Sequence, residues 1–133
     1  MYAVEVAVTG GPDVLQYVER PVPSPGPGEV LIRADAIGVN FIDTYFRSGL
    51  YPRELPFVVG QEVCGTIAAV GDDVAAINVG DRVVTANATG AYSEFSTAPA
   101  DFVAYVPDNV PSDAIASALL KGLTAHYLIK SVY

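Results

Sequence analysis

A short segment, residues 38–52, brings together an amide, a carboxylate, a guanidinium and phenols, on Asn40, Asp43, Arg47, Tyr45 and Tyr51. Such groups can line a pocket for a polar ligand with an aromatic part, with the two tyrosines as flat walls that carry a hydrogen-bonding tip. The same residues also fit structural roles. If Asn40 caps a short helix, Asp43 and Arg47 stand four residues apart and can pair on one face. The residues alone leave both interpretations open.

The chain has few of the residues that usually bind metal ions or act as nucleophiles. The chain has one cysteine, Cys64, and one histidine, His126. A structural zinc site takes about four Cys or His ligands and a catalytic one about three protein ligands. A zinc site built from nitrogen and sulfur ligands is therefore effectively excluded. We expect Cys64 to be a small buried thiol, and a Ser-His-Asp triad through His126 is disfavoured because no Gly-x-Ser-x-Gly elbow is present.

Charge and composition exclude several other classes of protein. The chain has 7 Lys and Arg against 15 Asp and Glu, a formal net charge of −8, and no basic run. This balance argues against nucleic-acid binding. No uncharged stretch approaches the roughly 18 residues of a spanning helix, and the N-terminus lacks the positive charge of a signal peptide. A single cysteine cannot form an internal disulfide, which fits a cytoplasmic protein of one folded domain.

Loops that hold phosphates are also missing. The pairs Gly10-Gly11 and Gly26-Pro27-Gly28 do not make a G-x-G-x-x-G fingerprint, and neither opens a helix after a strand. Any dinucleotide bound by this protein must therefore be held mainly by residues beyond Tyr133.

Short strands are the elements that must position these residues. Strand-like runs separated by Gly and Pro fill the first two thirds of the chain. We predict them at residues 2–9, 15–19, 29–39, 63–70, 82–86, 92–97 and 102–106, a series typical of an all-β barrel. The Pro-rich segment 21–28 is expected to be an ordered loop, and residues 41–47 to form a short helix.

Apart from residues 41–47, a helical pattern is found in the last part of the chain. We predict that Ser112 caps a helix from Asp113, that Gly122 breaks it, and that residues 124–132 form a second helix. The chain is thus divided into a β-barrel domain, 1–111, and a helical segment, 112–133. Because the pattern stops without a capping Gly or a polar tail, we expect a larger partner or second domain to follow. The apolar last helix is then a surface for association, such as a homodimer contact.

Several motifs, in their order and spacing, resemble the quinone oxidoreductase (zeta-crystallin-like) branch of the medium-chain dehydrogenase/reductase superfamily. The resemblance covers nearly the whole chain. It rests on Gly10-Gly11-Pro12-Asp13-Val14-Leu15, Gly38-Val39-Asn40-Phe41-Ile42-Asp43-Thr44-Tyr45, Arg47-Ser48-Gly49-Leu50-Tyr51-Pro52, Gly60-Gln61-Glu62, Gly65, Gly71, Gly80-Asp81-Arg82-Val83, Gly90-Ala91-Tyr92-Ser93-Glu94-Phe95 and Leu120-Lys121-Gly122-Leu123-Thr124-Ala125-His126-Tyr127-Leu128.

This resemblance implies a two-domain, NADPH-dependent enzyme. The part present would be the mainly β, GroES-like β-barrel catalytic domain, with its C-terminal helical segment leading into an absent Rossmann domain. Zinc-dependent alcohol dehydrogenases of the superfamily have a Cys ligand where this chain has Asn40, and Gly-His-Glu where it has Gly60-Gln61-Glu62. Neutral amides are poor zinc ligands, so the resemblance implies the zinc-independent branch.

The resemblance also implies roles for individual residues in the cleft between the two domains. Asn40, Lys121 and Thr124 would lie on the nicotinamide-ribose side, and Tyr45 and Tyr51 on the substrate side as the catalytic pair. Asp43 is counted with the cofactor-binding residues, but we favour for it a role in ordering this loop, through Arg47. For Lys121 and Thr124 the alternative is a plain helix surface, and for Tyr51 it is loop packing before Pro52.

Three functions follow as hypotheses. The first is NADPH:quinone oxidoreductase activity of the intact protein on a quinone or similar small electrophile, with the 133-residue chain inactive alone. The second is an NADPH-dependent enone or aldehyde reductase of the same superfamily. The third is a GroES-like module that binds a partner without catalysis.

Overall fold

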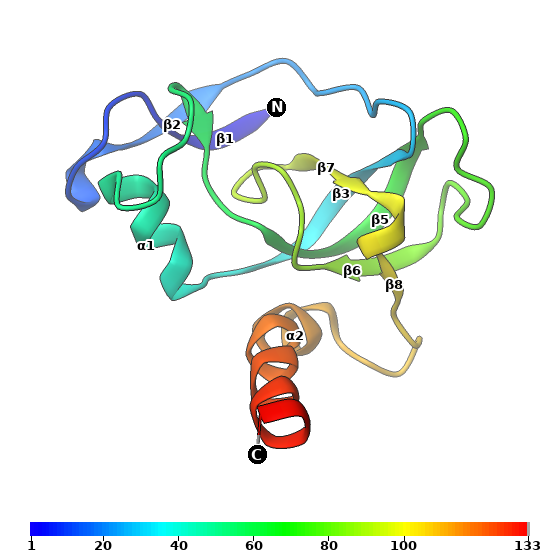
Figure 1. The fold of residues 1–133 in the computed structure, drawn as a ribbon. Coiled ribbons are helices and arrows are strands. Elements are labelled where there is room, and N and C mark those ends of the chain that lie inside the picture. The colour runs from blue at the N-terminus through cyan, green and yellow to red at the C-terminus, as the bar shows by residue number, and fades with distance from the viewer. Residues whose placement is uncertain (133) are drawn as a thin grey trace.

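A computed structural model describes residues 1–132 of the chain, which form two antiparallel sheets and two α-helices (Figure 1). The smaller sheet has the strand order β2-β1-β4 and the larger one the order β7-β3-β5-β6-β8. The strands are β1 (Tyr2–Val6), β2 (Leu15–Glu19), β3 (Glu29–Gly38), β4 (Phe57–Val58), β5 (Glu62–Val70), β6 (Arg82–Thr85), β7 (Phe95–Pro99) and β8 (Ala104–Tyr105). Short 3-10 turns lie at Pro12–Val14 and Ala100–Phe102.

The pairing of β3 with β5 forms the centre of the larger sheet. The two strands run antiparallel from Val30 opposite Val70 to Gly38 opposite Glu62, with irregularities after Leu31 and Ala34. Their inward side chains, together with those of β6 and β7, bury a core free of charge. Its fully buried members include Val30, Ile32, Val63, Ile67, Val83 and Ala98. This core fixes where the last residue of β3 and the first of β5 meet.

Helix α1 (Phe41–Ser48) starts two residues after β3 ends. Asn40 is its N-cap residue, in extended conformation, as the sequence predicts. The helix ends at Gly49, whose φ of 83° lies in the left-handed region that glycine adopts at low cost. The short β3–α1 connection carries Asn40 and Asp43 to the end of the central strand pair.

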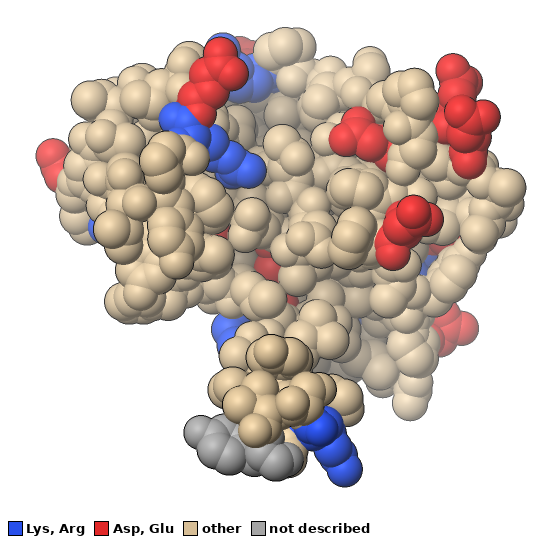
Figure 2. Space-filling view, in the orientation of Figure 1, with Lys and Arg blue, Asp and Glu red and all other residues tan. Residues whose placement is uncertain are grey.

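Helix α2 (Ser112–Tyr127) packs by its first half against β3, β5 and β6. Ala116 is buried there, and its neighbours Ile115 and Leu119 contact a small cluster that contains Cys64 and Val84. Beyond Leu120 every described residue is exposed, through a π-helical turn at Leu128–Val132. Figures 1 and 2 show this stretch projecting from the body of the protein, with a mostly uncharged surface.

Helix α2 differs from the prediction in two respects. Helix α2 runs through Gly122 without a break, because one glycine costs only about 1 kcal/mol relative to alanine among good helix formers. The N-cap residue is Pro111 rather than Ser112. The Ser112 hydroxyl accepts a hydrogen bond from Arg82 at 2.9 Å, and Arg82 also donates to the carbonyls of Pro107 and Val110.

Three predicted strands differ clearly from the observed ones. The first, predicted at residues 2–9, ends at Val6. Residues 92–94 precede β7 and pair with β1 instead, where the Val4 N–H donates to the Tyr92 carbonyl at 2.8 Å and Ala3 faces Ser93. The predicted strand 102–106 is reduced to β8 by the preceding 3-10 turn, which the Val103 N–H closes onto Ala100. Strand β4 was not predicted, because two residues are too few to show a period.

The prediction of a mainly β fold is confirmed. Within residues 1–132, hydrogen bonding forms two separate sheets and does not close into one continuous barrel, since β7 and β8 are both edges of the larger sheet. The boundary between 111 and 112 stays a prediction. In the described part of the chain, no helix is both long and apolar enough to cross a membrane.

Candidate active site

A fully buried carboxylate, that of Glu62, lies where β3 ends and β5 begins. Its Oε2 accepts hydrogen bonds from Asn40 Nδ2 at 2.7 Å and from Lys121 Nζ at 3.1 Å. Its Oε1 accepts from the backbone N–H of Leu120 at 2.9 Å. Because an ionised buried carboxylate needs several donors, these three contacts explain how a charge can lie in the interior here.

The close approach of three chain segments at this point requires a glycine at position 38. A Cβ on Gly38 would lie 2.3 Å from Glu62 Oε2 and 2.3 Å from the carbonyl oxygen of Ala116 in α2. Real Cβ atoms do not approach other atoms so closely. Gly38 therefore lets both the carboxylate and helix α2 sit directly on the end of β3.

On the α1 side, the polar contacts continue through Asp43. Asp43 Oδ2 accepts from the backbone N–H of Asn40 at 2.9 Å and from the Tyr92 hydroxyl at 2.9 Å. The first contact is the carboxylate half of a capping box. Burial raises the pKa of Tyr92, and its hydrogen bond to the Asp43 carboxylate and the charge of that group raise it further. The Tyr92 phenol is therefore held as a neutral donor.

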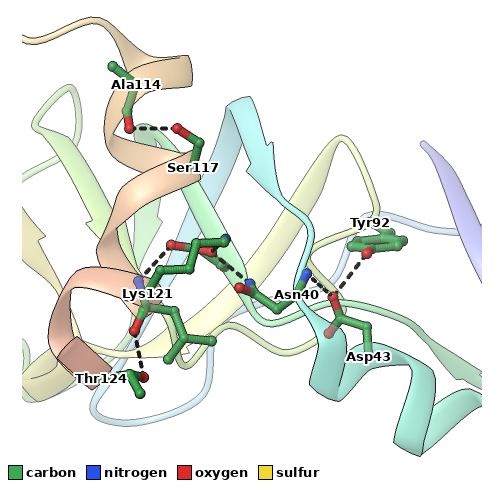
Figure 3. Close-up of polar contacts among 9 residues, drawn as sticks. Asn40, Asp43, Tyr92, Ala114, Ser117, Lys121 and Thr124 are labelled. Carbon is green, nitrogen blue, oxygen red and sulfur yellow. Dashed lines mark hydrogen bonds and ion pairs between the residues drawn. The ribbon is translucent and has the colours of Figure 1, made fainter. Parts of the chain in front are cut away.

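We call Tyr92, Asp43, Asn40, Glu62 and Lys121 the polar row. Figure 3 shows it running from Tyr92 and Asp43 at α1, through Asn40, to Lys121 on α2. Asp43 and Asn40 are 5% and 8% exposed, whereas the Lys121 side chain is 50% exposed. The row therefore fixes its members inside the protein and presents one ammonium group at the surface.

Thr124 lies one helical turn beyond Lys121, on the exposed part of α2. Its hydroxyl donates to the carbonyl of Leu120 at 2.9 Å, so the side chain is bound to its own helix (Figure 3). Both lone pairs of the hydroxyl oxygen stay available to a donor. Contact of Thr124 with a cofactor stays a prediction.

Tyr45 and Tyr51 form a second group, with Phe41 and Phe46, on a different side of α1. The ring centroids of Tyr45 and Tyr51 are 5.2 Å apart in an edge-to-face arrangement, and Phe41 and Phe46 add contacts at 5.4 and 5.7 Å. The Arg53 guanidinium lies 4.9 Å from the Phe46 ring centroid. We call these five residues the aromatic cluster. Within residues 1–132, no hydrogen bond or ring contact joins it to the polar row.

The predicted pairing of Asp43 with Arg47 is wrong. Asp43 turns inward to Asn40 and Tyr92, while Arg47 Nε donates to the carbonyl of Gly10 at 3.3 Å. The capping contact and the half-buried Tyr92 phenol satisfy the carboxylate inside the protein, while the half-buried Arg47 is engaged by the Gly10 carbonyl. The role of Arg47 is thus to fasten α1 to the turn after β1.

Glu62 and Tyr92 are members of the polar row that sequence reasoning did not single out. Both stand in motifs that carry the family resemblance, Gly60-Gln61-Glu62 and 90–95, and this was the available signal. Gly60 allows the two motifs to approach each other closely. Its φ is 95°, and a Cβ there would lie 2.3 Å from the Tyr92 ring.

The remaining candidates for chemistry lie apart. Cys64 is fully buried, as predicted, and burial raises its thiol pKa. His126 is exposed on the last turn of α2. Among the residues that the structure describes, no three His, Cys, Asp or Glu side chains gather where they could hold a metal ion.

The fold and this site match a known family. The family model "Alcohol dehydrogenase GroES-like domain" matches residues 26–108, which include β3 to β8 and most of the polar row. The chain belongs to this family. The GroES-like assignment made from the sequence is thereby confirmed.

Relatives of the GroES-like chain include several quinone oxidoreductases. That of Pseudomonas aeruginosa is 45% identical over 98% of the chain and 41% of its own length. A mycobacterial structure complexed with NADPH is 69% identical, with a TM-score of 0.97, over 100% of the chain and 42% of its own. A 2-haloacrylate reductase of a Burkholderia species is 43% identical over 93% of the chain and 39% of its own. The chain thus spans about two fifths of the length of these relatives.

Proposed function

We propose that this chain is the catalytic-domain portion of an NADPH-dependent quinone oxidoreductase. The observation that carries the proposal is the match of its whole length to a mycobacterial structure complexed with NADPH, at 69% identity. The similarity to quinone oxidoreductases supports a quinone as the substrate class. The polar row adds fixed hydrogen-bond donors beside a cluster of aromatic rings.

The donors present suit one part of NADPH better than another. Lys121 offers a half-exposed ammonium, and Thr124 an exposed hydroxyl on the next turn of the same helix. One cation and one hydroxyl fit the hydroxyls and carbonyl of the nicotinamide-ribose half. A pyrophosphate would need more donors than this acidic chain provides here, which is consistent with the expected nucleotide-binding domain elsewhere.

The chemistry requires little from the chain beyond positioning. Bound NADPH supplies the hydride, and an electron-poor quinone accepts it readily because the product ring is aromatic. Lys121 and Asn40 keep their places on the cofactor side through Glu62. Tyr45 and Tyr51 offer ring edges and faces to a flat substrate. No metal Lewis acid is needed for such an acceptor, so we propose a zinc-independent reaction.

The test is NADPH oxidation by the protein that carries this chain, expressed at its full length, with 1,4-benzoquinone as acceptor. We expect turnover that survives treatment with a zinc chelator, with a zinc-dependent alcohol dehydrogenase as the chelator-sensitive control. Absence of NADPH oxidation with any electrophile would overturn the proposal in favour of a non-catalytic binding module. Chelator-sensitive oxidation of alcohols would contradict the zinc-independent part.

A second candidate is reduction of an activated alkene. The 43% identity to a 2-haloacrylate reductase favours it, and hydride addition to an enone needs the same kind of positioned donors. The values of kcat/KM for 1,4-benzoquinone, a simple enone and 2-chloroacrylate, measured with one enzyme preparation, separate the two. A preference for the alkene of tenfold or more would make the chain part of an enone or acrylate reductase.

We extend the proposal to location and partners. A chain with one fully buried cysteine and a net charge of −8 suits the cytoplasm, and its acidic balance disfavours nucleic-acid binding. The exposed apolar side chains beyond Leu120 suit a homodimer contact; they are Leu123, Tyr127, Leu128, Ile129 and Val132. Light scattering at high concentration tests the dimer, and a strict monomer would count against it.

A further inference from the structure

We infer that Glu62 is the positioning residue of the cofactor side, the group that fixes Lys121 and Asn40 in place. The inference rests on the proposed function, because it assigns Lys121 to NADPH contact. Glu62 itself is fully buried and touches no solvent. Its effect must therefore pass through the groups it holds.

Three donors from two elements converge on this one carboxylate. Asn40 belongs to the start of α1, and Lys121 and the Leu120 N–H belong to α2. Along the chain, Glu62 is 22 residues from Asn40, 59 from Lys121 and 58 from Leu120. A single buried charge thus joins α1, β5 and α2, and substitution of Glu62 would release all three contacts together.

The contact with Leu120 is unusual because it lies inside a helix. An N–H at this position of α2 ordinarily donates to the carbonyl four residues earlier, that of Ala116. The Ala116 carbonyl lies directly over Gly38, and the Leu120 N–H also donates to a side chain outside the helix, to Glu62 Oε1 at 2.9 Å. Glu62 therefore fixes the position of this turn of α2 on the sheet.

Leu120 is also the last residue of α2 that is half-buried rather than exposed. From Lys121 onward the described helix has no cover from the sheets. Glu62 thus holds α2 at the point where it leaves the body of the protein, and holds the Lys121 ammonium beside that point. A lysine already held in one place loses less side-chain freedom when it binds a ligand.

Two effects of removing the Glu62 charge can be separated by ionic strength. If Glu62 positions Lys121, the variant Glu62→Gln binds NADPH more weakly at every salt concentration. If Glu62 only neutralises Lys121, the freed positive charge binds the phosphates of NADPH more tightly at low salt. The sign of the change at low salt therefore decides between positioning and neutralisation.

The experiment compares wild type, Glu62→Gln, Lys121→Met and the double variant in the full-length protein, with Lys130→Met as matched control. Lys130 is an exposed lysine of the same helical segment. We expect the KM for NADPH to rise about 2- to 10-fold in each single variant, at low and high salt, with kcat changed less. The double variant should show less than the product of the two single effects, because part of the Glu62→Gln effect passes through Lys121, and Lys130→Met should match wild type.

Several outcomes would overturn the inference. The first is an unchanged or lower KM for NADPH in Glu62→Gln. The second is a KM for NADPH in the double variant that rises by the product of the two single effects. The third is an unchanged KM for NADPH in Lys121→Met. The last variant removes a half-exposed side chain, so it decides the matter even if Glu62→Gln does not fold.

A spectroscopic measurement separates this inference from the proposed function. In protein labelled with nitrogen-15 lysine, the ammonium resonance lost in Lys121→Met should show restricted motion in wild type and become mobile in Glu62→Gln. If wild type does not oxidise NADPH, the proposed function fails while this signal still reports positioning. If NADPH is oxidised but the resonance is equally mobile in both proteins, the positioning role fails.

Discussion

Helix α1 carries two groups of polar and aromatic side chains that are held in opposite ways. On its inner side, Asp43 and Asn40 join the polar row, whose hydrogen bonds measure 2.7–3.1 Å and whose central carboxylate is fully buried. On the other side, Tyr45 and Tyr51 belong to the aromatic cluster, in which Phe41 is 75% and Tyr51 45% exposed. One group is fixed by directional bonds, and the other by ring contacts open to solvent.

The difference indicates that the two groups have different roles. A buried network of directional hydrogen bonds is costly to break and holds its members in one geometry. Exposed edge-to-face contacts contribute about 0.5–1.5 kcal/mol and allow the rings to adjust. We therefore expect substitutions in the polar row to affect stability and cofactor binding, and those in the aromatic cluster to affect acceptor binding alone.

The largest effect is expected from Gly38→Ala. The added methyl would lie 2.3 Å from Glu62 Oε2 and 2.3 Å from the Ala116 carbonyl, so either the carboxylate or α2 must move. We expect a loss of about 3 kcal/mol in the free energy of unfolding, measured by urea denaturation.

The matched control is Gly122→Ala, at a position with nothing within 4 Å of the added methyl. This helical site should become more stable by about 0.5–1 kcal/mol. Equal effects of the two substitutions would show that the polar row is not the rigid part of the molecule.

A smaller effect is expected from Tyr92→Phe, which removes only the hydroxyl bound to Asp43. The carboxylate keeps the Asn40 N–H, and its second oxygen, Oδ1, already has no partner among the described residues. We expect a loss of about 1–2 kcal/mol in unfolding free energy. The same substitution at Tyr45, in the aromatic cluster, should change it by less than about 0.5 kcal/mol. Similar losses at the two tyrosines would contradict the comparison.

The pH dependence of the Tyr92→Phe effect sharpens this test. The folded-state pKa of Tyr92 is raised above the ordinary tyrosine value of about 10, first by burial and then by Asp43. The folded protein therefore binds this proton more tightly than the unfolded chain. The stabilisation is fully present below about pH 10 and is lost as the pH rises above it. The difference in unfolding free energy between wild type and Tyr92→Phe should shrink from pH 9 to pH 11; a constant difference would contradict it.

Elements set by local pattern could be predicted from the sequence. Strand β2 has the predicted bounds, β3 and β5 differ from theirs by one residue, and Asn40 caps a helix that begins at the predicted residue. Each of these follows from alternation or from a capping residue within a few positions. The fold class also follows from the spacing of such runs.

The polar row could be predicted only in part, because its centre depends on distant contacts. Asn40, Asp43 and Lys121 were candidates by type and resemblance, but the carboxylate that holds two of them stands 22 and 59 residues away from them. The predicted Asp43–Arg47 pair failed for the same reason. A local spacing rule could not show that Tyr92, 49 residues away, would bind Asp43.

A small effect on stability is expected from Tyr51→Leu, which tests the aromatic cluster directly through substrate binding. Tyr51 contacts Tyr45 and Phe46 through its ring edge and is 45% exposed, so the unfolding free energy should change by less than about 1 kcal/mol. The KM for 1,4-benzoquinone should rise about 2- to 5-fold, because a flat substrate loses one ring contact, while the KM for NADPH stays unchanged. Tyr17→Leu, at a 72% exposed ring that stacks on Tyr2 in the smaller sheet, is the control and should leave both KM values unchanged. A rise in the KM for NADPH with Tyr51→Leu would mean that the two sides of α1 act on one ligand.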